Sequence, residues 1–116
     1  MTQLTLEGIL RDVAIEVRCK TERTLVLRRL LKEYPGNSSR AQCQRLFAAL
    51  QLLGSATTLE LARDADIFDP PARKFSLVNQ GHNIGLAWDY DETEAGVLHR
   101  VGRYFIAREA VKEVLQ

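Results

Sequence analysis

Cysteine, proline and methionine are scarce in this 116-residue chain, which contains two, three and one of them, respectively. Cys19 and Cys43 lack the spacing of metal ligands, and such a sparse pair is typical of reduced thiols in a cytoplasmic protein. No apolar run approaches the roughly 20 residues that a membrane-spanning helix needs. The N-terminus lacks a basic segment before a long apolar stretch, so no secretory signal is expected.

The chain also lacks an excess of charge of either sign, because its 16 lysine and arginine residues nearly balance its 15 aspartate and glutamate residues. The formal net charge is +1 and no part of the sequence is strongly basic, so a nucleic-acid contact would have to come from a local patch. The sequence shows no Ser/His/Asp or Cys/His set, no phosphate-binding glycine loop and no paired-carboxylate signature. We therefore expect a protein without enzymatic activity, without a cofactor and without a metal site.

Apolar residues make up 46% of the chain, which is enough for one packed core. Near the N-terminus, aliphatic residues recur at helical spacing and predict helices over roughly 4–18 and 22–34. An alternation of β-branched residues leaves a strand over 13–19 as an alternative. Residues 1–38 would thus form a helical extension. Its apolar faces within 4–34 would either pack on the following domain or pair two chains as a homodimer.

The middle of the chain carries two clear helix starts. A serine of the Asn37-Ser-Ser39 run is expected to cap a helix that ends at Gly54. The Thr57-Thr-Leu-Glu60 run has the spacing of a capping box, so one of its threonines is expected to cap a short second helix. That helix should end near Asp66, and its shortness suits the first helix of a helix-turn-helix.

A third helix is predicted over residues 70–80. Asp69 suits the N-cap, and Pro70 takes the first helical position, where its missing N–H costs nothing. The glycine that follows this range can adopt the left-handed conformation of a C-cap. Phe75 and Val78, which are three residues apart, are expected to face the core.

A β-hairpin is predicted next. The alternation of apolar residues over 84–88 indicates a strand, and His99–Ala107 is the returning strand. The acidic segment Asp89–Gly96 reads as the loop between them. Trp88 and Tyr104 are expected in the core of the hairpin.

These elements in this order predict a fold that is mainly α with a small β-hairpin. A helix-turn-helix followed by a hairpin is the skeleton of a winged helix-turn-helix, which would span residues 39–107. The helical extension at 1–38 would precede it, and a short C-terminal helix at 108–116 would follow it.

The ordered set of motifs resembles a phage-type winged helix-turn-helix family over about Ser39 to Ala107. Members usually have an apolar residue where Lys74 stands. The resemblance implies a winged helix and a small DNA-binding protein of a phage or mobile element, either a transcriptional regulator or an accessory recombination factor. The matching residues are Thr57, Thr58, Leu59, Glu60, Pro70, Ala72, Arg73, Gly81, His82, Ile84, Gly96, His99, Arg100, Val101 and Tyr104.

A helix-turn-helix reads double-stranded DNA by placing its second helix in the major groove, which assigns recognition to residues 70–80. Arginine can pair with guanine and asparagine with adenine, while hydroxyl and cationic side chains contact phosphates. Arg40 and Arg45 are further candidates for phosphate contacts. The expected DNA-binding residues are Thr57, Thr58, Arg73, Lys74, Ser76, Asn79, Arg100 and Arg103.

The acidic segment favours a different function. Asp89, Asp91, Glu92 and Glu94 would be repelled by phosphates if they formed the tip of a DNA-binding hairpin. This segment either points away from DNA or binds a basic protein surface. The alternative function is therefore a phage-type protein-interaction module that binds and inhibits a host nucleic-acid-processing enzyme, as anti-CRISPR proteins do.

Overall fold

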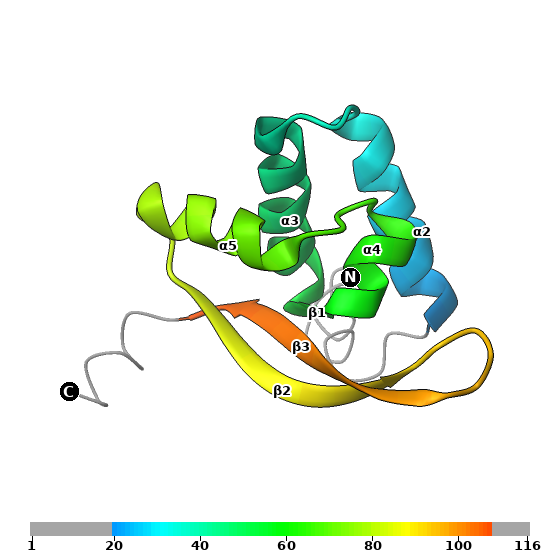
Figure 1. Ribbon diagram of the computed structural model, residues 1–116. Helices are drawn as coiled ribbons and strands as arrows, with labels where there is room; N and C mark the ends of the chain where they lie inside the picture. The colour runs from blue at the N-terminus through cyan, green and yellow to red at the C-terminus, as the bar shows by residue number, and fades with distance from the viewer. Residues whose placement is uncertain (1–19, 108–116) are drawn as a thin grey trace, which may run out of the picture.

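Four helices and a three-stranded antiparallel sheet form the described part of the chain, residues 20–107 of a computed structural model. The helices gather on one side, with α5 and α2 on opposite sides of α3, and a long hairpin runs beneath them (Figure 1). The sheet order is β1-β3-β2. The elements are α2 (Lys20–Glu33), α3 (Ser39–Leu53), β1 (Ser55–Thr57), α4 (Thr58–Asp64), α5 (Pro70–Asn79), β2 (Ile84–Glu92) and β3 (Leu98–Ile106).

Several predictions concern segments outside the described residues. These are the helix over 4–18, its alternative strand over 13–19 and the terminal helix over 108–116. Within residues 20–107, no helix is long and apolar enough to cross a membrane.

The predicted helix starts are confirmed by their capping contacts. The Ser38 hydroxyl accepts a hydrogen bond from the Ala41 N–H at 3.0 Å, so it begins α3. Gly54 ends α3 with φ of 84°, a backbone conformation that favours glycine. The capping box of α4 is complete, because Thr57 accepts from the Glu60 N–H and Glu60 accepts from the Thr57 N–H.

The predicted boundaries of α5 are also confirmed, to within one residue. Asp69 accepts a hydrogen bond from the Ala72 N–H, and Pro70 begins the helix. Gly81 has φ of 99°, and the His82 N–H donates to the Leu77 carbonyl at 3.0 Å. This pair of features is a Schellman motif, which satisfies a carbonyl that the helix end would otherwise leave free.

One core joins α2 to the elements that follow it. Leu27 and Leu30 of α2 are buried, so the apolar face of the helix predicted over 22–34 packs on the chain's own domain. Arg23 adds a polar link, since its Nε lies 2.5 Å from Glu60 Oε2. The core residues are Leu27, Leu30, Cys43, Leu46, Ala49, Leu50, Leu53, Ala56, Leu61, Ala65, Ile67, Leu77, Ile84 and Tyr104.

Glu60 caps α4 and also pairs with Arg23 of α2. We therefore expect Glu60→Ala to lower the free energy of unfolding by about 2 kcal/mol. The change removes half of the capping box and leaves the largely buried Arg23 without its carboxylate partner, with the Ser55 carbonyl as its remaining acceptor. Urea denaturation followed by circular dichroism measures the loss. Glu33→Ala is the matched control, because Glu33 pairs with Arg29 on an exposed surface, where a pair contributes about 0.5 kcal/mol or less. Equal losses for the two variants would contradict the assignment.

The structure corrects the extent of the hairpin. Strand β2 continues through Glu92, so the first half of the acidic segment predicted as a loop is strand, and the turn covers only the residues between Glu92 and Leu98. The three-residue strand β1, which was not predicted, pairs with β3. Trp88 was predicted in the core and is 64% exposed, whereas Tyr104 is buried as expected.

Candidate nucleic-acid interface

Helix α5 turns one side to the core and the opposite side to solvent. Leu77 is 3% exposed, and Pro70, seven residues earlier on the same side, is also buried. Phe75 and Val78 are 66% and 45% exposed, so the prediction that they face the core is wrong. Phe75 lies about 200° around the helix from Leu77, because each residue advances about 100°. The outward side of α5 is therefore apolar.

The polar residues of α5 take different positions around this apolar side. Asn79 is exposed and follows Phe75 by four residues, so it shares the outward face. Arg73 precedes Leu77 by four residues and is half-buried on the core-facing side, with a buried Nε that makes no hydrogen bond within residues 20–107. Ser76 donates to the Ala72 carbonyl at 3.2 Å.

A groove separates α5 from the sheet. We call it the α5–sheet groove, and its volume is about 280 Å³. Lys74 is the charged residue of its lining, which includes no carboxylate. The lining residues are Pro71, Lys74, Phe75, Val78, Leu86 and Tyr104. This groove joins the outward side of α5 to one face of β2.

The same face of β2 continues along the hairpin as an exposed aromatic surface. Trp88 and Tyr90 follow Leu86 at alternate positions on this face and are 64% and 62% exposed. The Arg100 guanidinium carbon lies 4.4 Å from the centre of the Trp88 ring, in a cation–π contact. Gly102 stands opposite Trp88 in the register, so no cross-strand side chain covers the indole there.

A second groove, the hairpin groove, lies beside this aromatic surface and has a volume of about 460 Å³. Its lining includes Arg100 and His99 and no carboxylate. Gly102 lies between the two grooves. A Cβ at this position would lie 2.7 Å from Cδ1 of Leu86, which lines the α5–sheet groove, and 3.4 Å from Oγ1 of Thr58, which lines the hairpin groove. Thr58, whose hydroxyl donates to the Gly102 carbonyl, lines the hairpin groove.

Two of the hairpin carboxylates are held by the domain itself, on the other face of β2. Arg103 Nε lies 2.6 Å from Asp89 Oδ2, and this hydrogen bond lowers the pKa of Asp89. Asp91 accepts a hydrogen bond from the Thr57 hydroxyl at 2.6 Å. The hydrogen bond from Arg63 to Asp64 raises the pKa of Arg63, and the charge of Asp91 acts in the same direction.

The two remaining hairpin carboxylates lie at its tip. Glu92 is exposed at the end of β2, where it pairs with Leu98 in the register. Glu94 lies in the turn and lines a hollow together with Lys20, Arg28 and Arg63. Of the four hairpin carboxylates, Glu94 therefore lies beside basic residues of α2 and α4, while Glu92 shares the face of β2 that carries Trp88 and Tyr90.

A family model described as a winged helix-turn-helix domain matches residues 41–109. The chain belongs to this family. No curated protein and no solved structure matches the chain. Winged helix-turn-helix domains are DNA-binding modules, typically without enzymatic activity, so membership supports a DNA-binding protein in general.

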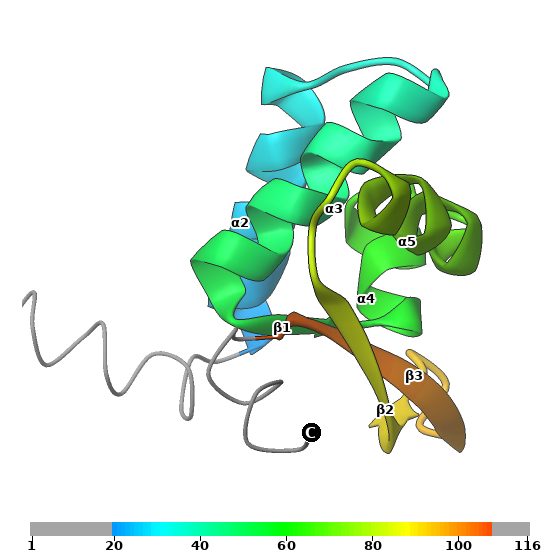
Figure 2. The same cartoon turned by 90° about the vertical axis from the view of Figure 1, so that its left-hand side faces the viewer.

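In the winged helix-turn-helix, α4 and α5 form the helix-turn-helix and β2–β3 forms the wing. Figure 2 shows α5 and α2 on opposite sides of the molecule, with the wing below. The two grooves lie where α5 and α4 meet the wing. Of the residues expected to bind DNA, the structure brings Thr58, Lys74 and Arg100 to these grooves.

Two predicted phosphate contacts are corrected by burial. Thr57 is 0% exposed, and its hydroxyl is occupied by Glu60 and Asp91. Arg45 is also 0% exposed, and its guanidinium donates to backbone carbonyls instead of facing solvent. A sequence signal for Arg45 exists, because Ala41 and Ala49 lie one turn before and after it and are both buried.

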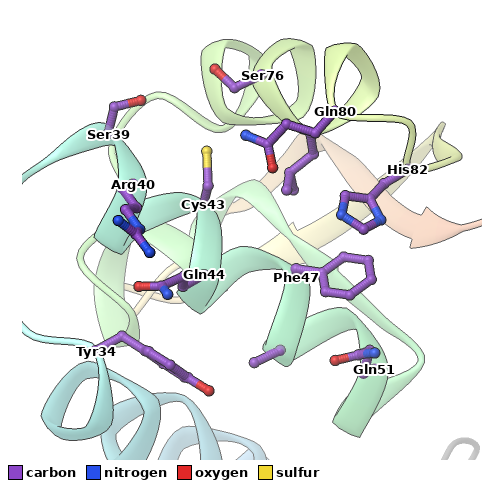
Figure 3. A pocket seen from close by; sticks show the side chains of 12 residues that line it. Tyr34, Ser39, Arg40, Cys43, Gln44, Phe47, Gln51, Ser76, Gln80 and His82 are labelled. Carbon is purple, nitrogen blue, oxygen red and sulfur yellow. The ribbon is translucent and has the colours of Figure 1, made fainter.

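A separate cleft of about 650 Å³ lies between α3 and α5 (Figure 3). Ser76 and Gln80 line it from α5. Ser76 therefore turns away from the outward side of α5, and the prediction that it contacts DNA is wrong. The rings of Phe47 and His82 are in contact, tilted by 36° with a centroid distance of 4.2 Å. Arg40 is the charged residue of the lining. Within residues 20–107, no three His, Cys, Asp or Glu side chains gather into a metal site.

Proposed function

We propose that this protein is a regulator that binds double-stranded DNA, with α5 in the major groove and the wing against the sugar–phosphate backbone. The observation that carries the proposal is the distribution of charge around the two grooves. Arg73, Lys74 and Arg100 form no ion pair within residues 20–107, whereas Asp89 is paired with Arg103 on the opposite face of the wing. A polyanion can therefore approach the grooves without meeting a carboxylate in their linings.

The proposed roles follow from position. Lys74 contacts a phosphate from the α5–sheet groove, and Arg100 contacts one from the hairpin groove. Thr58 lies in the hairpin groove, and its hydroxyl can exchange the Gly102 carbonyl for a phosphate oxygen as its acceptor. Asn79 reads a base, because it stands on the outward side of α5. Arg73 is left out, because it is half-buried on the core-facing side of α5 and lines neither groove. Arg103 is left out, since its guanidinium is held by Asp89 and Ser55.

The proposed biological context and regulatory role of this protein rest on its ordered sequence motifs alone. They support a phage or mobile-element protein that acts as a transcriptional regulator or accessory recombination factor. The hypothesis of a homodimer through residues 4–34 is weakened, because Leu27 and Leu30 are already buried in the domain and are not free to pair two chains. The protein-interaction alternative loses part of its basis too, because Asp89 and Asp91 are engaged within the domain.

Salt dependence tests the proposed function. Two phosphate contacts, by Lys74 and Arg100, give a slope of about −1.8 in a plot of log affinity against log salt, which is about a twelvefold loss between 50 and 200 mM. Fluorescence anisotropy with a labelled random-sequence duplex measures the slope. Glu33→Gln is the control that should behave like the wild type, because Glu33 is exposed on α2, which lies on the opposite side of α3 from α5 (Figure 2). No binding to any duplex at low salt would refute the proposal.

A further inference from the structure

We propose that the outward face of α5 reads A·T base pairs by contacting the methyl groups of thymine. This inference rests on the proposed DNA-binding function and narrows its target to double-stranded DNA rich in A·T pairs. It concerns Ala72, Phe75, Val78 and Asn79, which occupy the side of α5 opposite the buried Leu77.

The composition of this face is unusual for a helix in contact with water. A surface helix normally presents charged and polar residues on its solvent side. Phe75 and Val78 are instead 66% and 45% exposed, and their spacing of three residues places them side by side. The cations of α5 stand at its flanks, Lys74 toward the α5–sheet groove and Arg73 toward the core. The apolar patch therefore calls for a partner that offers apolar groups.

Charge indicates that this partner is a polyanion. The α5–sheet groove and the hairpin groove, which adjoin the apolar face, contain Lys74, Arg100 and His99 in their linings and no carboxylate. The hollow at the wing tip, by contrast, includes Asp64 and Glu94. An apolar stripe bordered by cations matches double-stranded DNA, whose phosphates border a groove that carries thymine methyl groups.

The chemistry of the major groove makes the choice of base specific. The C5 methyl of thymine is the apolar group exposed there, and phenylalanine and alanine side chains contact it. Asn79, one turn after Phe75, can make two hydrogen bonds to adenine N6 and N7. Both halves of an A·T pair thus find a complementary side chain on one face of α5.

The test compares duplexes that differ by the methyl group. Alternating dA·dT, alternating dA·dU, alternating dG·dC and its 5-methylcytosine form are titrated by fluorescence anisotropy at one length and one salt concentration. We expect the dA·dT duplex to bind more tightly than dA·dU by about fourfold for each methyl contacted. We also expect 5-methylcytosine to strengthen binding to the dG·dC duplex, because it places a methyl at the same position of the groove.

Protein variants locate the contact on α5. Phe75→Ala should lower the ratio of dA·dT to dA·dU affinity toward one, because it removes the largest of the apolar side chains on this face. Phe68→Ala is the matched control, because Phe68 is 76% exposed but precedes α5, and it should keep the wild-type ratio. Asn79→Ala should reduce the preference for dA·dU over dG·dC.

The outcomes separate the two proposals. Equal affinity for dA·dT and dA·dU would overturn the methyl contact and leave DNA binding intact. No binding to any of the four duplexes would overturn the proposed function itself. Light scattering provides a further check, because a dimer that Phe75→Ala converts to a monomer would show that a second copy covers this face, and the inference would be wrong.

Discussion

Arg45→Ala is expected to lower the free energy of unfolding by about 3–5 kcal/mol, a large part of the 5–15 kcal/mol typical of a small domain. The Arg45 side chain is wholly buried and donates to four backbone carbonyls. Alanine would leave these acceptors buried without a donor, at about 1–3 kcal/mol for each that water cannot reach. Burial lowers the pKa of Arg45, and the charge of Asp66 acts against that shift.

The position of these carbonyls explains why one side chain matters so much. Tyr34 and Gly36 belong to the loop between α2 and α3, and their carbonyls lie 2.6 and 2.9 Å from Arg45 Nη1. Ala65 and Asp66 form the turn between α4 and α5, and Asp66 has φ of 55°, which is rare for a residue other than glycine. Arg45 therefore holds the turn that orients α5.

Thermal and urea unfolding, followed by circular dichroism, measure this effect. Arg40→Ala is the control, because Arg40 lies in the same helix and is exposed, so its loss should be within about 0.5 kcal/mol. Arg45→Lys should give an intermediate loss, since one ammonium group has three donors and cannot span both loops. If Arg45→Ala were as stable as Arg40→Ala, Arg45 would not hold the turn.

The contrast between Arg40 and Arg45 shows which features a sequence reveals. Both were expected to contact phosphate. The sequence aligns Arg45 with Ala41 and Ala49 on α3, but the carbonyls that bind its guanidinium are identified only in the fold. The helix caps were predictable because each depends on residues within one turn, as in the pairing of Thr57 with Glu60. The burial of Arg45 depends on two loops that lie up to 21 residues away in the sequence.

The wing illustrates the same limit. The alternation of Ile84, Leu86 and Trp88 predicted correctly that they share one face of a strand. Their exposed fractions rise from 6% to 39% to 64%, because the helices cover only the first part of that face. Strand β1 was missed because three residues carry no period of their own, and pairing with β3 defines them as a strand.

Reversing the charges of Lys74 and Arg100 together is expected to weaken DNA binding by about a hundredfold or more. Each reversal removes one phosphate contact and places a carboxylate beside the DNA, and a loss of about 1.4 kcal/mol per site is tenfold. The slope against log salt should fall by about two, since about one unit is lost for each phosphate contact. Anisotropy titrations of Lys74→Glu/Arg100→Glu across salt concentrations measure both quantities.

The double variant Arg29→Glu/Lys32→Glu is the matched control, because it changes the net charge of the chain by the same amount. Both residues are exposed on α2, which lies on the opposite side of α3 from α5 (Figure 2). A protein that bound DNA through its overall charge would lose the same affinity in both double variants. A large loss confined to Lys74→Glu/Arg100→Glu would instead place the DNA at the two grooves. Equal losses would remove α5 and the wing as the binding surface, and with them the reading of thymine by Phe75.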